Sequence, residues 1–470
     1  FKVYLMTNLF IFSNDLRLKD NQALYEASIN SKALQAVFIF SPKKWDTHNE
    51  SHLKIKFQIK NLEILKKELE NLNINLKILF SDNIEDEPKV ITQEALRVKA
   101  NNIFINSEYG VNEKRRDEEL KKLLEKENVV LKQFDSSIIN PNKLVTGSGT
   151  FFKVFTPYSK SFRNELNQDY LNLFPAPKKQ QNMLSDSDRI PEFELKDELK
   201  EKALTAYEPG EKAAINSLEN FIENKIINYK VERDFPSKDS TSKLSIYLSS
   251  GIISAKTCVA NLLAKSEDLP GSGEYSWFNE IIWREFYKYI IFHYPRVSMR
   301  KSFNEKYDAL QWRDSKEDFE AWTTGNTGFP IIDAAMKQLI TTGWMHNRLR
   351  MVVAMFLSKN LLIDWKKGEE FFMQNLIDGD HASNVGGWQW SASTGVDAAP
   401  YFRIFNPITQ SEKFDKEGIF LKKYLPNLES LSDKEIHNPS IESREKLQYP
   451  SPIVDLSFSR KRAIEVFSKI

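Results

Sequence analysis

The sequence predicts an α/β protein in which a doubly wound parallel sheet domain is followed by an all-α domain. Over the first 135 residues, short apolar runs alternate with amphipathic helical segments. Such alternation is typical of a parallel sheet with helices on both faces. Beyond about residue 200, strand patterns almost vanish and helical periodicity continues. A chain of 470 residues is long enough for two or more domains.

Five apolar runs in the N-terminal region are predicted to form the strands of the sheet. They are 9–12 (LFIF), 36–40 (AVFIF), 76–80 (LKILF), 103–105 (IFI) and 129–131 (VVL). Between the second and third runs, Leu62, Leu65 and Leu69 recur at intervals of three and four residues, which predicts a helix lying on the sheet. Ligands of such sheets bind at the carboxyl edge of the strands.

Changes in composition predict the domain boundaries. Residues 174–191 (FPAPKKQQNMLSDSDRIP) are rich in Pro, Gln and Ser and show no periodicity, as in a linker. We therefore predict an α/β domain over 1–135, an interdomain linker over 136–200 and an all-helical domain over 201–470.

Composition narrows the classes of protein that the chain can belong to. An apolar fraction of 41% and a mean hydropathy of −0.48 fit a globular protein. No apolar run approaches the roughly 20 residues of a membrane-spanning helix, and residues 1–5 lack the pattern of a signal peptide. The single cysteine, Cys258, excludes an internal disulfide and suits a reducing compartment. We expect a cytoplasmic monomer that does not bind membranes.

Charge and histidine content bear on metals and nucleic acids. The six histidines form no ligand motif, so we predict no metal site. A net charge of +1 and an isoelectric point of about 7.8 lack the basic excess that nucleic-acid binders often show. Any DNA-binding surface must therefore be local.

The most informative stretch is 378–407 (DGDHASNVGGWQWSASTGVDAAPYFRIFNP). It combines carboxylates, an amide, a glycine pair and two indoles with little aliphatic content. A segment that only fills a core would show Leu, Ile and Val at helical spacing. The composition favours a site for a large planar polar molecule, whose N–H groups Asp378 and Asp380 can bind.

Two other motifs favour a binding site in the helical domain, and each has an alternative. The turn 241–245 (TSKLS) precedes a helix, where hydroxyls and free N–H groups suit a diphosphate; the alternative is a plain N-cap. In 277–287 (WFNEIIWREFY), helical spacing places one carboxylate on a face with several aromatic side chains. A Glu280–Arg284 ion pair among core aromatics is the alternative, because a buried carboxylate needs a partner.

These motifs resemble those of the DNA photolyase/cryptochrome family, and the resemblance covers nearly the whole chain. Residues 15–21 (DLRLKDN) resemble the DLRxxDN motif of that family, although Ser13-Asn14 stands where an arginine is common. A strand-to-helix loop capped by Asp20 or Asn21 is the alternative. Within the family, the chain is most similar to microbial class I cyclobutane-pyrimidine-dimer photolyases. No GxGxxG or Walker sequence indicates a dinucleotide or ATP site.

The resemblance implies light-dependent repair of cyclobutane pyrimidine dimers in DNA, a carbon–carbon lyase reaction. Excited, fully reduced FAD would pass an electron to the flipped-out dimer and then recover it. The implied FAD-binding residues are Tyr229, Thr241, Ser242, Lys243, Leu244, Ser245, Trp277, Arg284, Asp378, Gly379, Asp380 and Asn384. Asn384 matches the position that faces flavin N5, and Asp378 is expected to pair with Arg350.

The resemblance also implies a DNA-binding and a catalytic set. The DNA-binding residues are Arg233, Glu280, Trp283, Tyr287, Asn347, Arg348, Trp390, Gln410 and Lys413. Trp283 and Trp390 are expected to stack on the flipped bases. The catalytic set is Glu280, Asn347 and Met351; Glu280 would stabilise the radical anion, and burial among aromatics would raise its pKa. Alternatively, Met351 is simply core with Val352, Met355 and Phe356, and Arg348 is a solvated charge.

Two further sets follow from the same resemblance. Trp388, Trp365 and Trp312 match an electron relay from the flavin to the surface. His48, Asn112 and Glu113 match a pocket for an antenna chromophore, methenyltetrahydrofolate; the alternative is an exposed loop beside a helix N-terminus. Met299 stands where some folate-binding relatives have a lysine.

The competing function is a signalling cryptochrome, which binds flavin and responds to blue light without repairing DNA. Asn384, Met351 and Glu280 favour the repair enzyme.

Overall fold

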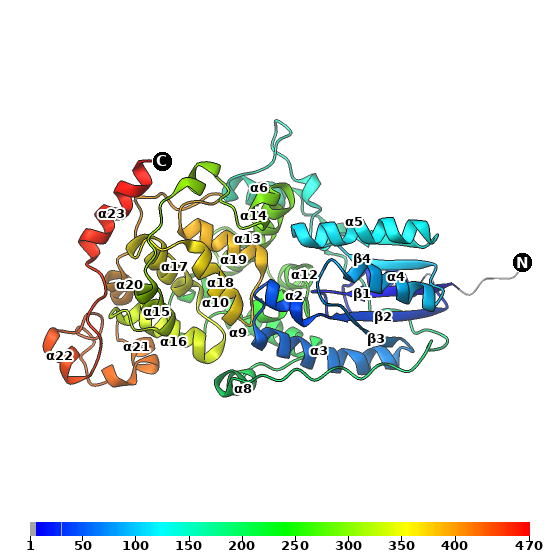
Figure 1. Ribbon diagram of the computed structural model, residues 1–470, viewed down its shortest axis with the longest axis horizontal. Helices are drawn as coiled ribbons and strands as arrows, with labels where there is room; N and C mark the ends of the chain where they lie inside the picture. Colours follow the sequence, from blue (N-terminus) through cyan, green and yellow to red (C-terminus); the bar gives the residue numbers. More distant parts are fainter. Residues whose placement is uncertain (1–5, 30) are drawn as a thin grey trace, which may run out of the picture.

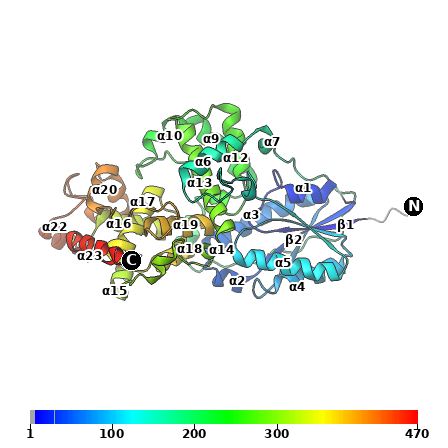
Figure 2. The same cartoon turned by 90° about the horizontal axis from the view of Figure 1, so that it is seen from above.

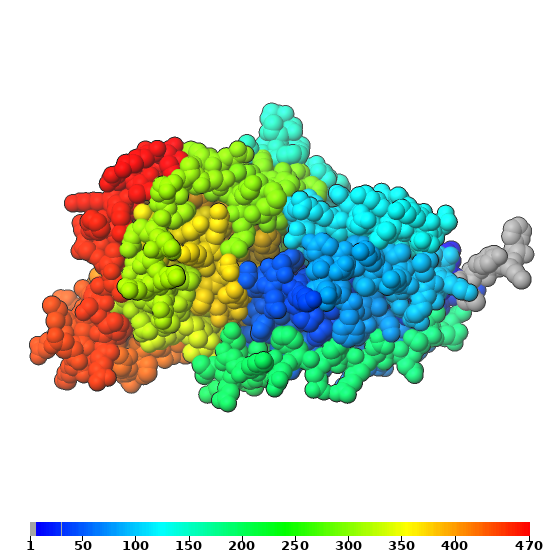
Figure 3. Space-filling view, viewed as in Figure 1, coloured from blue at the N-terminus to red at the C-terminus, as the bar shows by residue number. Residues whose placement is uncertain are grey.

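The computed structural model describes residues 6–29 and 31–470; residues 1–5, which carry the expectation of no signal peptide, lie outside the described residues. The α/β domain forms one end of an elongated molecule and the helical domain forms the other (Figure 1). The two domains are in contact, and the segment between β5 and α6 projects from the surface (Figure 3).

The sheet has five parallel strands in the order β3-β2-β1-β4-β5. They are β1 (Thr7–Phe12), β2 (Ala33–Phe40), β3 (Asn75–Phe80), β4 (Asn102–Asn106) and β5 (Val130–Phe134). All five predicted strands are confirmed. Because the strand order reverses between β1 and β4, the crevice outside their carboxyl ends is the expected ligand position.

Alternating side chains bury both faces of the sheet. Phe10 and Phe12 of β1 join the core cluster that includes the apolar sides of α1 and α3, whereas Leu9 and Ile11 join the cluster of α4 and α5. These helices are α1 (Gln22–Ile29), α3 (His52–Asn71), α4 (Glu87–Arg97) and α5 (Val111–Lys126). Figure 2 shows helices on both sides of the sheet. The doubly wound arrangement and the buried leucine stripe of α3 are confirmed.

The chain between the two domains is partly helical. It contains η1 (Pro141–Lys143), α6 (Phe155–Glu165) and α7 (Gln168–Leu171). The irregular stretch that follows runs beside the edge strand β3, where Asp188 donates its N–H to Leu76 O (2.8 Å) and accepts from Ile78 N (2.9 Å). It thereby covers an edge that would otherwise be open to pairing. The exact division into domains stays a prediction.

Beyond residue 197 the described chain is helical, as predicted, with one isolated bridge between Arg313 and Ile363. The helices are α8 (Glu198–Leu204), α9 (Glu211–Asn224), α10 (Ile226–Glu232), α11 (Ser245–Ser249), α12 (Ala255–Lys265), α13 (Gly273–His293), α14 (Pro295–Ser298), η2 (Glu305–Ala309), α15 (Lys316–Thr324), α16 (Pro330–Thr342), α17 (Asn347–Met355), the π-helical η3 (Phe356–Asn360), α18 (Trp365–Asn375), α19 (His381–Ser391), α20 (Pro407–Phe414), α21 (Ile419–Tyr424), η4 (Pro426–Leu428), α22 (Ile441–Lys446) and α23 (Leu456–Ser468).

Close packing of α13, α18 and α19 depends on two glycines. A Cβ at Gly386 of α19 would overlap the ring of Tyr287 on α13, and a Cβ at Gly368 of α18 would overlap the ring of Trp388. Any larger residue would therefore separate the helices that carry the aromatic side chains of the site.

Within residues 6–29 and 31–470, no helix is both long and apolar enough to cross a membrane. The same residues contain no group of three His, Cys, Asp or Glu side chains arranged to hold a metal ion.

Candidate active site

A cavity of about 520 Å³ opens in the helical domain, and we call it the main cavity. Its size lies in the range of small-molecule sites. The predicted FAD-binding residues that line it are Tyr229, Thr241, Ser242, Lys243, Leu244, Ser245, Trp277, Arg284, Asp378, Asp380 and Asn384. The predicted DNA-binding and catalytic residues that line it are Arg233, Glu280, Trp283, Tyr287, Asn347, Arg348, Met351 and Trp390. Gly379, Gln410 and Lys413 lie outside this lining.

The two aspartates between α18 and α19 are held as charged hydrogen-bond acceptors. Asp378 accepts from Arg350 Nη2 at 2.8 and 3.1 Å, which confirms the expected pair. Asp380 caps α19 by accepting from Ser383 N at 2.9 Å. Burial raises the pKa of Asp380, but the Arg284 and Lys288 cations outweigh that effect and lower it to about 2. The carboxylate of Asp380 is therefore charged near neutral pH.

Asn384 presents a free amide oxygen because its N–H groups are engaged. Its Nδ2 donates to Glu369 O at 2.9 Å and to Glu369 Oε1 at 3.0 Å. Glu369 is buried and its other carboxylate oxygen pairs with Arg300 Nε at 2.9 Å. Sequence reasoning missed Glu369. The sequence pattern that could have revealed Glu369 is a carboxylate at helical spacing from Trp365 and Phe372, on the same face of α18.

The 241–245 turn lines the main cavity at the start of α11, and its binding of a diphosphate stays a prediction. The N-cap residue of α11, Leu244, makes no side-chain cap bond. The Ser242 hydroxyl accepts from Trp277 Nε1 at 3.3 Å and from Leu244 N at 3.4 Å. Lys243 has a left-handed backbone (φ 52°), which turns the chain at this point. Hydroxyls and backbone N–H groups at the start of a helix suit an anionic diphosphate. The donor and acceptor set of the cavity thus fits FAD.

The carboxylate on α13 has an arginine partner from another helix. Glu280 Oε1 pairs with Arg233 Nη1 at 2.7 Å, whereas Arg284 pairs with Glu285 at 3.2 Å. The alternative of a Glu280–Arg284 pair is wrong, because Arg284 pairs instead with Glu285, the next residue along α13. Glu280 is about one-third exposed, so it is not enclosed by the aromatics alone.

Asn347 and Met351 both line the main cavity from α17, so the alternative of Met351 as simple core is wrong, whereas Val352 and Met355 are buried as it expected. The neighbouring His346 does not line the cavity: its Nδ1 accepts the N–H of Arg348 at 3.2 Å and caps the helix. Burial lowers the pKa of His346 to about 4. The imidazole is therefore neutral and serves as a structural acceptor.

The predicted cations gather at one rim of the main cavity. Arg348 pairs with Asp234 at 2.9 Å, and Asp234 directly follows Arg233 in the sequence. The Arg348 guanidinium lies 4.5 Å from the ring centroid of Phe414, and Lys413 Nζ lies 5.0 Å from the same centroid. Glu280 and Asp234 pair with Arg233 and Arg348, so the local basic surface expected for DNA binding stays a prediction.

Trp388 is buried against the main cavity and its indole Nε1 has no hydrogen-bond partner. Its ring contacts Phe372 and Trp322, at centroid distances of 5.0 and 6.0 Å. Trp365 is buried, and Trp312 is partly exposed beside Phe467. Sequence reasoning missed Trp322, whose place beside Trp388 depends on the packing of α15 against α18 and α19. The order of the electron relay stays a prediction.

A second cavity, of about 410 Å³, lies between the two domains, and we call it the interdomain cavity. His48, Asn112 and Glu113 line it, and His48 Nε2 lies 3.2 Å from Asn112 Nδ2. The three predicted antenna residues are thus brought together at one wall. Gly379 also lines this cavity, and its carbonyl accepts from Lys54 Nζ at 2.7 Å.

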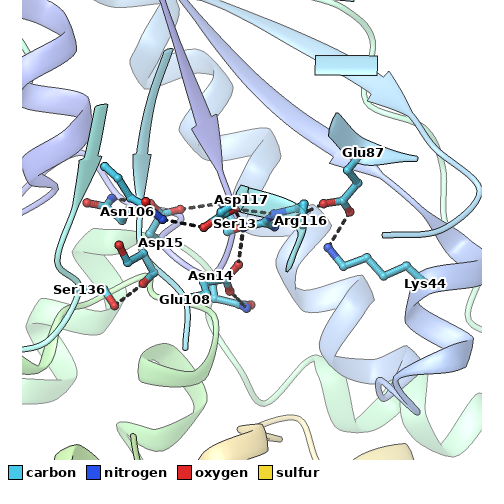
Figure 4. A network of polar contacts seen from close by, with 12 residues as sticks. Ser13, Asn14, Asp15, Lys44, Glu87, Asn106, Glu108, Arg116, Asp117 and Ser136 are labelled. Atoms are coloured by element: carbon cyan, nitrogen blue, oxygen red, sulfur yellow. Dashed lines mark hydrogen bonds and ion pairs between the residues drawn. The ribbon is translucent and has the colours of Figure 1, made fainter. Parts of the chain in front are cut away.

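The crevice between β1 and β4 is filled by a network of charged side chains (Figure 4). Arg116 is buried and pairs with Asp117, Glu87 and Glu108 at 2.8, 3.3 and 3.4 Å. In the same network, Asn106 Nδ2 donates to Asp15 at 2.6 Å. Asp15, Asn106 and Glu108 of this network also line the interdomain cavity, so a ligand bound there would lie against the network.

The 15–21 motif is a capped loop. Asn21 Oδ1 accepts from Leu24 N at 3.2 Å at the start of α1, which confirms the capping alternative for this residue. Asp15 is buried within the polar network, and burial raises its pKa. The motif therefore shapes the wall of the interdomain cavity.

Comparison with known proteins places this geometry in a family. The DNA photolyase family model matches residues 8–178, and the model of the FAD binding domain of DNA photolyase matches residues 277–469. The chain is 41% identical to the deoxyribodipyrimidine photo-lyase of Buchnera aphidicola, covering 98% of this chain and 97% of that protein.

Solved structures agree with this placement. A bacterial class III photolyase from Agrobacterium tumefaciens superposes with a TM-score of 0.90 at 32% identity, covering 100% of this chain and 98% of that one. A Synechocystis cryptochrome superposes with a TM-score of 0.87 at 27% identity, covering 99% of this chain and 100% of that one. With both family models matched and a relative this similar along its whole length, the chain belongs to the DNA photolyase family.

Proposed function

We propose that this protein is a deoxyribodipyrimidine photo-lyase that repairs cyclobutane pyrimidine dimers in DNA under blue light. One observation carries the proposal: a single cavity is lined both by a donor and acceptor set that fits FAD and by two indoles, a carboxylate and arginines that fit a flipped dinucleotide. When bound and reduced, FAD supplies the light-activated electron that opens the cyclobutane ring and takes it back afterwards.

The side chains of this chain would bind and orient the two partners. Arg350-paired Asp378, together with Asp380 and Asn384, would bind the flavin, and the 241–245 turn would hold the diphosphate. Trp283 and Trp390 would stack on the flipped bases, which returns about 1–3 kcal/mol per base against an extrusion cost of a few kcal/mol. Glu280 and Asn347 would hydrogen-bond the lesion.

The function is tested by a repair assay that includes a flavin measurement. The purified protein is expected to release about one FAD per chain on denaturation. It should restore a dimer-containing oligonucleotide under blue light and leave it unchanged in the dark. FAD binding without any repair would instead support a cryptochrome-type signalling protein, and a folded protein that takes up no FAD would refute both functions.

We further propose that the interdomain cavity holds a folate antenna, methenyltetrahydrofolate, with His48, Asn112 and Glu113 at its wall. The proposal is supported by the size of the cavity and by the juxtaposed polar side chains. Met299 stands where some relatives have a lysine, so the nearest cation in sequence is Arg300. Arg300 pairs with Glu369 and Glu370.

The antenna proposal is tested by direct binding. Titration of the protein with methenyltetrahydrofolate should show saturable binding, and Glu113→Ala should weaken it by about tenfold because a charged hydrogen bond is lost. His52→Ala is the matched control, since His52 is exposed and lies outside the cavity lining. If the wild-type protein binds FAD but no folate, the cavity takes another chromophore or none.

A further inference from the structure

Phe155 is the first residue of α6 and lies in the segment that the sequence predicts to be a linker. Its ring is nearly parallel to the indole of Trp283, with an interplanar angle of 3° and a centroid distance of 3.7 Å. Trp283 also contacts the rings of Phe286 and Tyr287, at 5.8 and 5.5 Å. The indole is therefore fixed by three aromatic neighbours.

The phenyl ring covers one face of the Trp283 indole. Trp283 lines the main cavity, whereas Phe155 is not among its lining residues. Because one face already carries an aromatic partner, only the opposite face is left for a base that enters the cavity. A platform held in this way loses little rotamer freedom when a base stacks on it.

A hydrogen bond ties this backing ring to the second indole. The N–H of Phe155 donates to Asp397 Oδ2 at 3.0 Å. Two residues further on, Ala399 donates its N–H to the carbonyl of Trp390 at 3.2 Å. Asp397 has a left-handed backbone (φ 46°), which Asp tolerates better than most residues. The loop after α19 therefore connects the backing of Trp283 to Trp390 itself.

We propose that Phe155 and Asp397 are positioning residues for lesion binding: Phe155 fixes Trp283 by stacking on its outer face, and Asp397 fixes Phe155 relative to Trp390. The proposal rests on the proposed function, in which the two indoles stack on the flipped dimer. Neither residue is among those that line the main cavity. The segment between the domains is therefore part of the lesion site.

The test compares Phe155→Leu with Phe155→Tyr in the FAD-loaded protein. Phe155→Leu removes the stacked ring and keeps an apolar side chain, so KM for dimer DNA should rise about fivefold to tenfold, with kcat and the affinity for undamaged DNA unchanged. Phe155→Tyr restores the stack and should return KM to the wild-type value. Phe151→Leu is the matched control, because Phe151 stacks on His293 at the same centroid distance of 3.7 Å.

Asp397 supplies an independent pair of variants if Phe155→Leu does not fold. Asp397→Gly keeps the left-handed backbone but removes the acceptor of the Phe155 N–H, and it should raise KM for dimer DNA. Asp397→Asn keeps an acceptor and should return KM to the wild-type value. Unchanged KM in Phe155→Leu, or in Asp397→Gly where Phe155→Leu does not fold, would overturn the proposal, as would an equal loss of affinity for damaged and undamaged DNA. If the proposed function itself is wrong, the wild-type protein already fails to repair.

Discussion

In Trp388→Phe, light-driven reduction of the bound oxidised flavin is nearly abolished, while the FAD content stays at the wild-type level. Phenylalanine fills most of the buried space between Gly368 and the cavity, but it is far harder to oxidise than an indole, so no electron can be drawn through this position. Absorbance changes under blue light with an external reductant measure the effect. Repair by chemically reduced protein should persist, because electron return from the lesion does not use the relay.

The other tryptophans make this prediction sharper. Trp365→Phe and Trp312→Phe should also lose photoreduction if the predicted relay is correct. Trp322→Phe is the matched control, because Trp322 is equally buried and its ring centroid lies 6.0 Å from that of Trp388, yet it is outside the predicted series. Loss in Trp322→Phe together with normal photoreduction in Trp365→Phe would show that the electron leaves through Trp322 instead.

The second large effect concerns the choice of lesion: cyclobutane dimers are expected to be restored in light, and (6-4) photoproducts to stay unrepaired. Repair of a (6-4) product moves an oxygen between bases and needs a proton donor that recovers near neutral pH, a role suited to histidine. Asn347 and Met351 cannot fill it. The adjacent His346 is an N-cap acceptor whose pKa burial lowers to about 4. Chromatography of oligonucleotides with each lesion, before and after illumination, measures the choice.

Within dimer repair, Glu280→Ala should lower the quantum yield by about tenfold or more, because a hydrogen bond to a charged group is lost. Binding of lesion DNA should change less, since Arg233 stays and is released from its 2.7 Å ion pair. Glu274→Ala, on the same helix but outside the cavity lining, is the control. Full repair by Glu280→Ala, or any repair of (6-4) DNA, would contradict the assignment.

The sequence predicts the fold well because its signals are local. The five apolar runs, the stripe of α3 and the helical periods beyond residue 200 are all readable from neighbouring residues. Many of the residues lining the main cavity are predicted as well, because their motifs fall on a few short segments. The roles of the individual residues stay predictions, which the variants described above test.

Partners that come from distant segments were not predictable from the sequence. The pairing of Glu280 with Arg233 depends on how α10 packs beside α13, and a spacing rule within one helix favoured Arg284 instead. Glu369 and Trp322 reach the site only through the packing of α18 and α15. Phe155 lies in the predicted interdomain linker and Trp283 is distant from it in sequence, so nothing in its neighbourhood indicates that its ring stacks on Trp283.

The wall between the two cavities has a thermodynamic consequence. Arg284 and Asp380, with Leu248 and Ser249, line both the main cavity and the interdomain cavity. A ligand that shifts any of these side chains from one side changes the free energy of binding on the other. Linkage requires that coupling to be reciprocal: whatever factor an antenna molecule exerts on flavin affinity, the flavin exerts on the antenna. The affinities of the two cavities for their ligands would then be coupled through this wall.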